Sequence, residues 1–338
     1  MMFLRKKAAL LSVLGLSVLF SCKSGDTDTG AGDAPAQIPA AGVPASLLTF
    51  NADSAYAYIE KQVSFGPRVP GTKGQRDCAD WMEGMLRRNC DTVVVQSVSV
   101  KAGDGRSLPC INLIGSFNPS AQRRYLLLAH WDTRPWADMD TKDKDKPIDG
   151  ADDGGSGVGV LLEIARQLRQ TPLPADLGVD ILLVDVEDYG KSEWGDDSYG
   201  LGTQYWAHNP HVPGYRAEGG ILLDMVGGQG ARFPMEQTSR MYAQPLLEKV
   251  WQTANAAGFS SYFSYELSAG GVTDDHTFVN EIARIPTIDI IHLTRATATG
   301  FPAHWHTHKD AMPIIDRGPL GAVGNTVLAF LRQLQPPV

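Results

Sequence analysis

Two adjacent acids, Glu187 and Asp188, stand at the end of the apolar run "VDVEDYG", residues 184–190. Two similar runs also lead to polar groups, because "LLLAH" ends in His130 and "ILLDMVG" contains Asp224. In open α/β sheets the functional site lies beyond the carboxyl ends of the parallel strands. We therefore expect these three carboxylates and this imidazole to converge on one site.

Three further segments bring more acids and imidazoles, and each has a simpler reading. "GADDGGSG", "TDDHTF" and "PAHWHTHKD" supply Asp152, Asp153, Asp274, Asp275, His276, His304, His306 and His308. Taken alone, Asp152 and Asp275 are as readily helix caps or turn residues, and His304 and His308 are expected to be exposed. Together, however, carboxylate oxygens and imidazole nitrogens are the ligands of a tetrahedral zinc site that leaves one position for substrate. The joint pattern favours a zinc enzyme.

Other site types fit the sequence poorly. The stretch "GSGVG", residues 155–159, does not match the dinucleotide-binding pattern GxGxxG, and Asp152 and Asp153 before it would repel a pyrophosphate. It also fails the nucleophile pattern GxSxG, because Val158 occupies the last glycine position. The mature cysteines, Cys78, Cys90 and Cys110, form no CxxC pair, so a zinc site built on thiolates is not expected. Their spacing leaves open which two of them, if any, form a disulfide.

The elements that must position these residues alternate along the chain from about residue 49. Short apolar runs typical of strands covered on both faces cover residues 110–117, 124–132, 178–188, 218–227 and 284–293, and residues 91–101 alternate as a half-exposed strand does. Helical spacing of apolar residues occurs at 52–66, 71–89, 155–169, 244–258 and 315–334. This order predicts an α/β fold, a three-layer sandwich with a mixed, mostly parallel central sheet flanked by helices.

The first 22 residues and the overall charge indicate where the protein is located and which kinds of partner it binds. The chain has 338 residues and a formal net charge of -8, which argues against nucleic acid as a partner. Residues 1–21 have a basic start and an apolar stretch too short to span a bilayer, as in an export signal. The ending "LFSC" resembles the bacterial lipobox, which implies lipidation of Cys22 and a lipid anchor in the cell envelope, with the outer membrane favoured. Residues 22–48 are then a flexible tether and residues 49–338 a single catalytic domain.

A known family carries the same motifs. The segments "HWDT", "GADDGGSGVGVLLEIA", "VDVEDYG", "LLDMVG", "TDDHTF" and "HWHT" resemble, in order and spacing, those of the zinc-dependent M28 aminopeptidase superfamily, over roughly residues 50–338. Within it the chain is most similar to the glutaminyl-peptide cyclotransferases, or glutaminyl cyclases, of the animal type. The marks of this branch are Trp305 directly before His306, the paired acids of "TDDH", and "DSYG" after a loop that carries Trp194.

The resemblance implies a set of metal ligands. Asp153, Asp188 and His306 are expected to bind one Zn²⁺ per chain. The animal enzymes have Glu at the position of Asp188. Because Asp is one methylene shorter, the end of its strand must lie nearer the metal, but carboxylate oxygens of both residues bind zinc at about 2.0 to 2.2 Å.

The resemblance also implies roles around the metal. Glu187 is the expected general acid and base, and Asp224 and Asp274 are the expected hydrogen-bonded acid pair opposite it. Trp194 and Trp305 are expected to line the substrate pocket. The implied reaction is an acyl transfer on peptides and proteins that begin with glutamine, in which the α-amine attacks the side-chain amide and ammonia leaves. One carboxylate near both nitrogens can take the proton and return it.

Two other functions compete with this reading. A dinuclear zinc aminopeptidase would use His130, Asp153, Asp188, Asp224 and His306 as ligands, and all five are present. The tryptophans and Asp274 favour the cyclase, although Trp is usually a packing residue. A non-catalytic binding domain on the same fold would be expected to have lost ligands, and none of the expected positions is lost.

Overall fold

The computed structural model describes residues 42–334. The expected signal peptide, Cys22 and the first part of the tether therefore lie outside the described residues. The last part of the expected tether, residues 42–48, lies against the domain: the N–H of Val43 donates to the carbonyl of Ala256 (3.2 Å), and Arg332 donates to the carbonyl of Leu47 (3.2 Å). A short 3-10 helix, η1 (Ala45–Leu47), precedes the first α-helix.

The centre of the domain is a six-stranded sheet in the order β1-β2-β4-β3-β5-β8. Its strands are β1 (Thr92–Lys101), β2 (Ser107–Phe117), β3 (Arg123–His130), β4 (Leu177–Val184), β5 (Gly219–Asp224) and β8 (Thr287–Ile291). The strands β4, β3, β5 and β8 are parallel, and β2 and β1 continue the sheet in antiparallel pairing. The predicted mixed, mostly parallel sheet is confirmed.

The register brings the carboxyl ends of the parallel strands together. Along the β3 and β4 pair, His130 lies beside Val184, and along the β5 and β8 pair, Asp224 lies beside Ile291. Every residue of β4 and β5 is buried, as expected of strands that are covered on both faces. Each fully buried Leu, Ile or Val side chain contributes about 1.5 to 3 kcal/mol. Burial of these side chains therefore stabilises the sheet whose strand ends carry His130 and Asp224.

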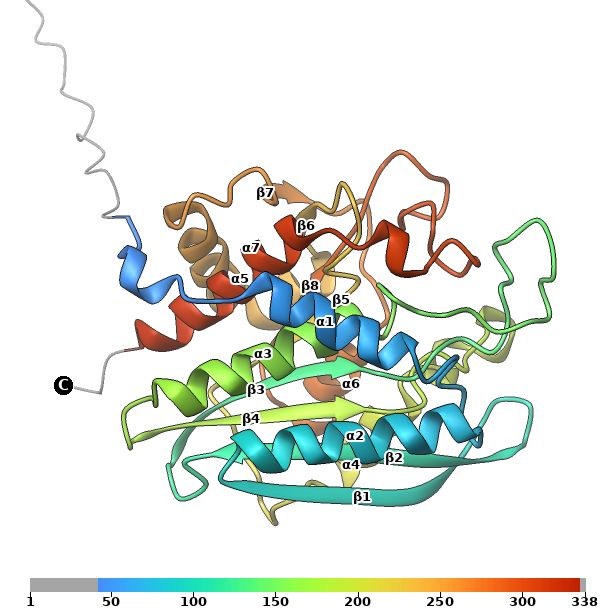
Figure 1. Ribbon diagram of the computed structural model, residues 1–338, viewed down its shortest axis with the longest axis horizontal. Coiled ribbons are helices and arrows are strands. Elements are labelled where there is room, and N and C mark those ends of the chain that lie inside the picture. The colour runs from blue at the N-terminus through green and yellow to red at the C-terminus, as the bar shows by residue number, and fades with distance from the viewer. Residues whose placement is uncertain (1–41, 335–338) are drawn as a thin grey trace, which may run out of the picture. The chain divides into compact units, whose positions relative to one another are not determined.

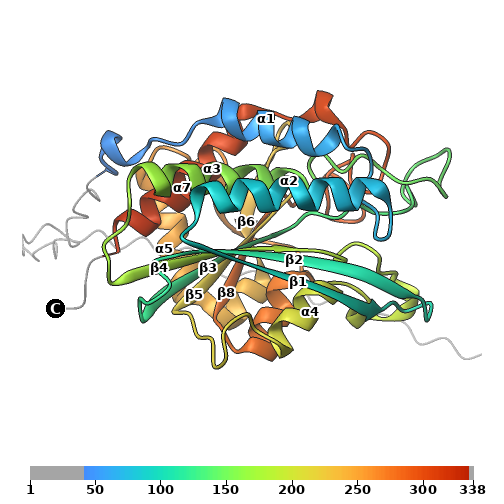
Figure 2. The same cartoon turned by 60° about the horizontal axis from the view of Figure 1, so that its bottom comes forward.

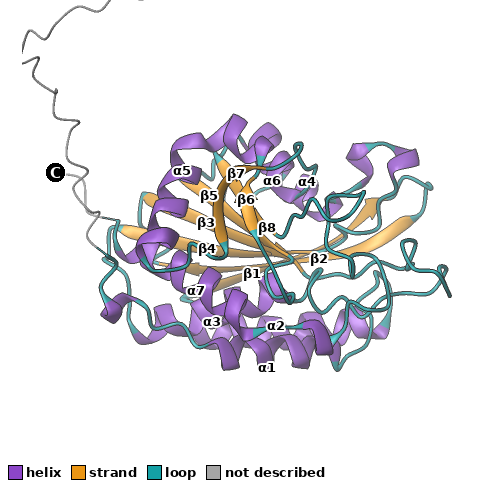
Figure 3. Cartoon of the chain, turned by 90° about the horizontal axis from the view of Figure 1, so that it is seen from above, coloured by secondary structure: helices purple, strands orange, loops and turns teal. Residues whose placement is uncertain are grey.

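Helices cover both faces of the sheet, as Figures 1 and 2 show. One face carries α1 (Ala52–Val63), α2 (Lys73–Asn89), α3 (Ser156–Gln170) and α7 (Arg317–Arg332), and the other carries α4 (Leu201–His208) and α6 (Asp275–Phe278). The long helix α5 (Gln237–Ala256) packs beside the edge strand β8 and against α7. Figure 3 shows the resulting three layers from above. A second, two-stranded sheet, β6 (Phe233–Met235) and β7 (Phe263–Leu267), was not predicted.

The glycines of "GSGVG" have a packing role. A Cβ on Gly157 would lie 2.1 Å from the carbonyl oxygen of Leu223, and a Cβ on Gly159 would lie 2.6 Å from the side chain of Ile59. These glycines let α3 approach β5 on one side and α1 on the other. The start of α3, which follows Asp153 by three residues, is thereby held close to the carboxyl end of the sheet.

Two absences complete the description of residues 42–334. The three cysteines of this part, Cys78, Cys90 and Cys110, are buried free thiols, and burial raises the pKa of Cys78 and Cys90 to about 12. Within the same residues, no helix is both long enough and apolar enough to cross a membrane.

Candidate active site

The chain turns sharply where β4 ends, which explains how Glu187 and Asp188 can serve one site. Consecutive side chains of a strand point to opposite faces, but β4 stops at Val184, and Val186 has a φ of 54°. A positive φ is a genuine outlier for a β-branched residue and persists only when the surroundings hold it. Here the N–H groups of Glu187 and Asp188 donate to the two carboxylate oxygens of Asp132 (3.0 and 3.1 Å).

The two preceding residues of the turn are held in the same way. The N–H of Asp185 donates to the side chain of Asn112 (3.0 Å), and the N–H of Val186 donates to the carboxylate of Asp185 (2.9 Å). The other oxygen of Asp185 accepts from Gln75 (2.7 Å) and from the backbone of Ile111 (2.8 Å). Side-chain oxygens thus fix every N–H from residue 185 to residue 188, so the turn is rigid before any ligand binds.

A second buried carboxylate fixes the loop that carries Asp153. Asp310 accepts hydrogen bonds from the N–H groups of both Asp152 (2.7 Å) and Asp153 (3.1 Å). Asp152 in turn accepts from the N–H of Gly227 (2.7 Å) and contacts the Nε2 of His304 at 2.8 Å. Asp152 therefore connects three loops of the site and does not cap a helix.

The three histidines at and directly after "HWHT", namely His304, His306 and His308, differ in burial. His304 is 9% exposed and is hydrogen-bonded to Asp152, so the expectation that it is a solvent-exposed residue was wrong. His308 is exposed, as expected, and contacts Asp140 at 3.0 Å. Between them, His306 is buried and adopts a φ of 55°, which turns its imidazole toward the end of the sheet.

The first candidate metal group comprises Asp153, Asp188 and His306, whose potential ligand atoms all lie within 4.8 Å of one another. The Nε2 of His306 lies 3.3 Å from Oδ1 of Asp188 and 3.8 Å from Oδ2 of Asp153. All three side chains are buried. The structure thus brings together the three residues that the sequence suggested as ligands.

Two residues that sequence reasoning missed orient this group. Arg134 donates to Oδ1 of Asp188 (2.9 Å), and Asp138 lies 3.3 Å from the Nδ1 of His306, the imidazole nitrogen opposite Nε2. A carboxylate behind a ligating histidine fixes its tautomer and raises its basicity. Burial alone would raise the pKa of Asp188, but His306 and Arg134 outweigh it and lower that pKa. Both supports lie in the irregular segment after β3, where no periodic pattern marks them.

A second group shares one residue with the first. The Nε2 of His130 lies 3.1 Å from Oδ1 of Asp153 and 3.3 Å from Oδ1 of Asp224. Asp153 therefore offers one oxygen to each group. Burial would lower the pKa of His130, but close contacts with the carboxylates of Asp132, Asp153 and Asp224 raise it well above the ordinary value.

The donor atoms fit a zinc ion. A tetrahedral zinc with bonds of about 2.0 to 2.1 Å has ligand atoms about 3.3 Å apart, and most of the contacts within the two groups match this spacing. In addition, Oδ2 of Asp188 and Oδ1 of Asp224 are buried without a hydrogen bond among the described residues. An unpaired buried carboxylate oxygen is costly unless a cation or a proton satisfies it.

Glu187 stands beside the first group and differs from it in two ways. It lines the cavity described below, and no hydrogen bond to its carboxyl group is found among residues 42–334. Burial, reinforced by Asp188, Asp274 and Asp275, raises its pKa well above the ordinary value. A carboxyl group with a raised pKa in this position can exchange a proton with a bound substrate.

The expected acid pair, Asp224 and Asp274, lies near Glu187, but no hydrogen bond joins the two residues in the described structure. Burial raises the pKa of both Asp224 and Asp274. The carboxylate of Asp274 raises the pKa of Asp224 further, and the carboxylate of Asp153 raises the pKa of both. Asp274 instead caps α6 with its side chain, because its Oδ1 accepts a hydrogen bond from the N–H of Asp275 (2.5 Å), and its Oδ2 has no partner among the described residues. Behind it lies Asp289, another buried acid whose pKa burial and Asp274 raise.

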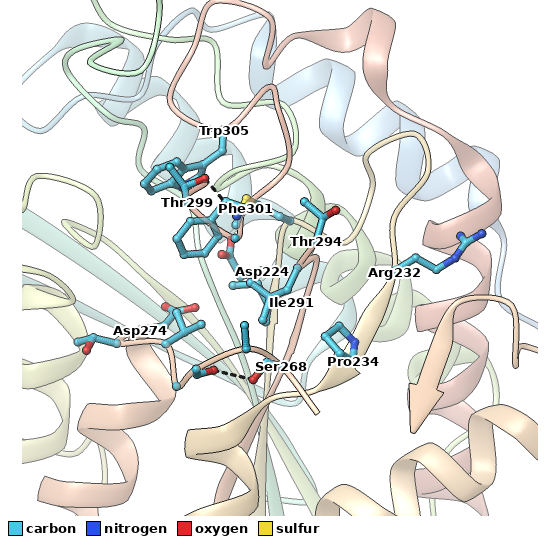
Figure 4. A pocket seen from close by; sticks show the side chains of 18 of the residues that line it. Asp224, Arg232, Pro234, Ser268, Asp274, Ile291, Thr294, Thr299, Phe301 and Trp305 are labelled. Atoms are coloured by element: carbon cyan, nitrogen blue, oxygen red, sulfur yellow. Dashed lines mark hydrogen bonds between the residues drawn. The ribbon is translucent and has the colours of Figure 1, made fainter. Parts of the chain in front are cut away.

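A cavity of about 770 Å³ opens in front of these groups. Trp305 lines it and stacks on His306 (ring centroids 3.6 Å apart) and on Phe301 (4.4 Å), as Figure 4 shows for the tryptophan and the phenylalanine. Trp194 is not among the lining residues. It packs against Trp136 and Tyr189 in a separate cluster over the β1 and β2 hairpin.

Comparison with known proteins places this site in a family. The model of "Peptidase family M28" matches residues 112–331. The crystal structure of Porphyromonas gingivalis glutaminyl cyclase is 51% identical, with a TM-score of 0.81, over 83% of this chain and 98% of that one. The crystal structure of a leucine aminopeptidase precursor from Bacteroides thetaiotaomicron is 45% identical, with a TM-score of 0.80, over 87% of this chain and all of that one.

A curated relative gives a more distant match. The glutaminyl-peptide cyclotransferase of Bos taurus is 24% identical over an alignment of 248 residues, and the match covers 65% of this chain and 65% of the bovine protein. About a third of the bovine protein's length therefore lies outside the match.

Proposed function

Because the chain belongs to peptidase family M28, and is an enzyme of the glutaminyl cyclase group within it, we propose that it converts the N-terminal glutamine of peptides and proteins into pyroglutamate with release of ammonia. The observation that carries the proposal is Glu187, a buried acid whose carboxyl group has no hydrogen-bonded partner among the described residues and which faces the cavity directly beside Asp188. A proton carrier is needed at this place, since the reaction moves a proton from one substrate nitrogen to another.

The residues of the chain account for the proton transfers. The α-amine of the substrate forms a bond to its own side-chain carbonyl carbon, and the carboxylate of Glu187 accepts the proton that this nitrogen loses. Glu187 then donates that proton to the departing amide nitrogen as its bond to carbon breaks, so ammonia leaves and Glu187 returns to its starting state. Asp274, which lines the same cavity, raises the pKa of Glu187 and so favours the protonated form that the second step requires.

Zinc suits the family and the donor atoms, and we propose one ion per chain held by Asp153, Asp188 and His306. When bound, it would polarise the side-chain carbonyl of the substrate and stabilise the developing oxyanion. Asp153, Asp188 and His306 are held in place by Asp310, Arg134 and Asp138, so the ligand atoms need little rearrangement to bind.

The aromatic wall favours the cyclisation. Trp305 and Phe301 lie stacked at the side of the cavity next to His306. A flat apolar surface beside the metal group can fold a short side chain back on its own amine and exclude water. We propose that Trp305 binds the substrate. Trp194 packs outside the cavity, so it would contact the substrate only if its loop moved.

The test is the reaction itself. Incubation of the zinc-loaded protein with a glutamine-initiated peptide should release ammonia and lower the peptide mass by one ammonia, and the product should resist N-terminal sequencing. Cleavage of a leucine-initiated peptide without any cyclisation would contradict the proposal.

A dinuclear zinc aminopeptidase remains the second candidate, and one observation favours it. Asp153 offers its two oxygens to separate groups, with His306 and Asp188 on one side and His130 and Asp224 on the other, as a metal-bridging carboxylate does. Elemental analysis distinguishes the candidates, because the cyclase should hold close to one tightly bound zinc per chain and the peptidase two.

Lipid anchoring in the cell envelope, facing the periplasm or the surface, is a further part of the proposal that depends on sequence alone. Replacing Cys22 with Ala should abolish labelling by a radioactive fatty acid and release the protein from the membrane fraction. Unchanged membrane association of the Cys22→Ala variant would overturn it.

A further inference from the structure

The cavity is larger than the proposed reaction requires. Its volume of about 770 Å³ lies in the range of about 300 to 1,000 Å³ that encloses a drug-sized ligand, whereas a single glutaminyl side chain is much smaller. Asp153, Glu187, Asp188, Asp224 and His306 line only one part of it. The remainder runs away from the acids, between the segment 266–274 and the segment 291–301, toward β6 and β7.

Two arginines line this far part. Arg232 directly precedes β6, and Arg295 lies four residues after β8. The N–H of Leu293 donates to the carbonyl of Arg232 (3.2 Å), so the two segments that carry the arginines run side by side. Figure 4 shows Arg232 beyond Pro234 and Thr294 as seen from Asp224.

Neither guanidinium group has an acidic partner in the part of the chain that the structure describes. Arg232 donates to the carbonyl of Ala231 (2.9 Å), and Arg295 has a long contact with the carbonyl of Leu267 (3.4 Å). Among residues 42–334, no carboxylate lies within 4.0 Å of either group. Glu266 lines the same part of the cavity, is exposed and has no ion-pair partner within residues 42–334. The two positive charges in this part of the cavity therefore exceed the one negative charge.

The hydroxyl groups around these arginines suit the same kind of ligand. Serines and threonines make up much of the remaining polar lining, namely Ser260, Ser261, Ser264, Ser268, Thr294 and Thr299. Hydroxyl groups can donate hydrogen bonds to an anion without adding a charge of their own. The far part of the cavity is thus polar and cationic, whereas the part next to Glu187 is rich in acids.

We propose that Arg232 and Arg295 form a subsite for a carboxylate that the substrate carries a few residues after its N-terminal glutamine. The proposal rests on the cyclase function and names its substrate class, peptides that are acidic near the N-terminus. The glutamine occupies the acidic end of the cavity, the following residues run along the 291–301 segment, and an aspartate or glutamate side chain reaches the arginines. Recognition therefore extends past the first residue.

The effect on activity should be modest and sensitive to salt. Ion pairs of exposed side chains contribute little each, so we expect kcat/KM to be about two- to tenfold higher for an acidic peptide than for its neutral counterpart at low ionic strength. The preference should shrink as salt is added, because exposed charges are screened.

The experiment uses the zinc-loaded enzyme and C-terminally amidated peptides that begin with glutamine. One series carries a single Glu at position 2, 3 or 4, and the matched series carries Gln at the same place. Ammonia release is measured for the wild type, for Arg232→Gln, Arg295→Gln and the double variant, and for Arg240→Gln as a control on the exposed surface of α5. Free-acid and amidated forms of the same neutral tripeptide show whether a C-terminal carboxylate can replace the side chain.

The wild type and Arg240→Gln should prefer the Glu peptides, and the double variant should lose this preference while turning over the neutral peptides at the wild-type rate. Equal kcat/KM for both series in the wild type, or a preference that survives in the double variant, would overturn the subsite. Absence of ammonia release from every peptide would instead remove the cyclase function on which the subsite depends.

Discussion

Buried carboxylates at the two ends of the central sheet differ in their hydrogen bonding. At the amino end, Asp180 of β4 accepts hydrogen bonds from Arg124 through both of its oxygens (2.7 Å each), from Tyr215 (2.7 Å) and from Ser116 (2.5 Å). At the carboxyl end, oxygens of Asp188 and Asp224 have no hydrogen-bonded partner among the described residues.

The pKa values show the same contrast. Burial would raise the pKa of Asp180, but contacts with His211 and Arg124 outweigh it and hold this pKa below its usual range. Burial raises the pKa of Glu187 and Asp224, and neighbouring acids add to the shift. The amino end thus stabilises the fold with a satisfied charge, whereas the carboxyl end holds acids ready for a cation, a proton or a substrate.

The largest expected effect concerns activity at the carboxyl end. Glu187→Gln should lower kcat by about 10² to 10⁴ while the zinc content and the thermal midpoint stay near the wild-type values, because only the proton carrier is lost. Ammonia release, elemental analysis and a thermal melt measure the three quantities. The control is Glu193→Gln, an exposed acid on the next loop, which should be fully active. A fully active Glu187→Gln enzyme would show that the proton carrier lies elsewhere.

The reverse pattern is expected at the amino end. Asp180→Asn leaves the buried Arg124 without its counter-charge, which should lower the free energy of unfolding by about 3 to 5 kcal/mol. The kcat of the folded fraction should not change, since the site lies at the other end of the strands. Urea unfolding gives the stability. A matched Asp176→Asn variant, which removes an exposed acid near the same end, should change it by less than about 1 kcal/mol.

A smaller effect is expected where the metal group is supported. Asp138→Asn should weaken zinc binding by about 10- to 100-fold, because the carboxylate behind His306 no longer fixes its imidazole. Competition with a chromogenic chelator measures the affinity. Asp140→Asn, which alters the exposed contact with His308 on the same loop, serves as the control. Equal zinc affinities of the two variants would show that Asp138 has no such role.

The smallest expected effect is a difference in acid sensitivity. The folded-state pKa of Asp180 is depressed, so its stabilisation is present above the unfolded pKa of about 3.9 and is lost as the pH falls further. Urea midpoints of the wild type and Asp180→Asn should therefore converge as the pH is lowered below about 4. A gap between the two proteins that stays constant with pH would mean that the Asp180 charge does not contribute.

Much of the site could be predicted because it follows strand ends. His130, Glu187, Asp188 and Asp224 come at the ends of apolar runs, and the carboxyl ends of parallel strands meet at one edge. The motif "GADDGGSG" and the resemblance to the M28 superfamily added Asp153 and His306. The small β6 and β7 sheet was missed, because its strands have only three and five residues and show no clear alternation.

The residues that hold the site in place could not be predicted from the sequence, for a different reason. Arg134, Asp138 and Asp310 lie in irregular segments, and their partners are distant in sequence, such as Asp188 and His306. A hydrogen bond between residues far apart in the chain leaves no periodic pattern. The exposure of His304 was misjudged for the same reason, since its partner, Asp152, precedes it by 152 residues.

The sequence by itself determined the order of strands and helices, the apolar runs that form the sheet, and the acids and imidazoles that follow those runs, because periodicity and strand ends are local properties. Only the tertiary structure decided how the tip of β4 turns at Val186 so that Glu187 and Asp188 serve one site, and which oxygens of Asp153 face which histidine. It also decided that Trp194 packs away from the cavity that Arg232 and Arg295 line. These features depend on side chains brought together by the burial of the sheet, and such contacts form only when distant segments pack against each other.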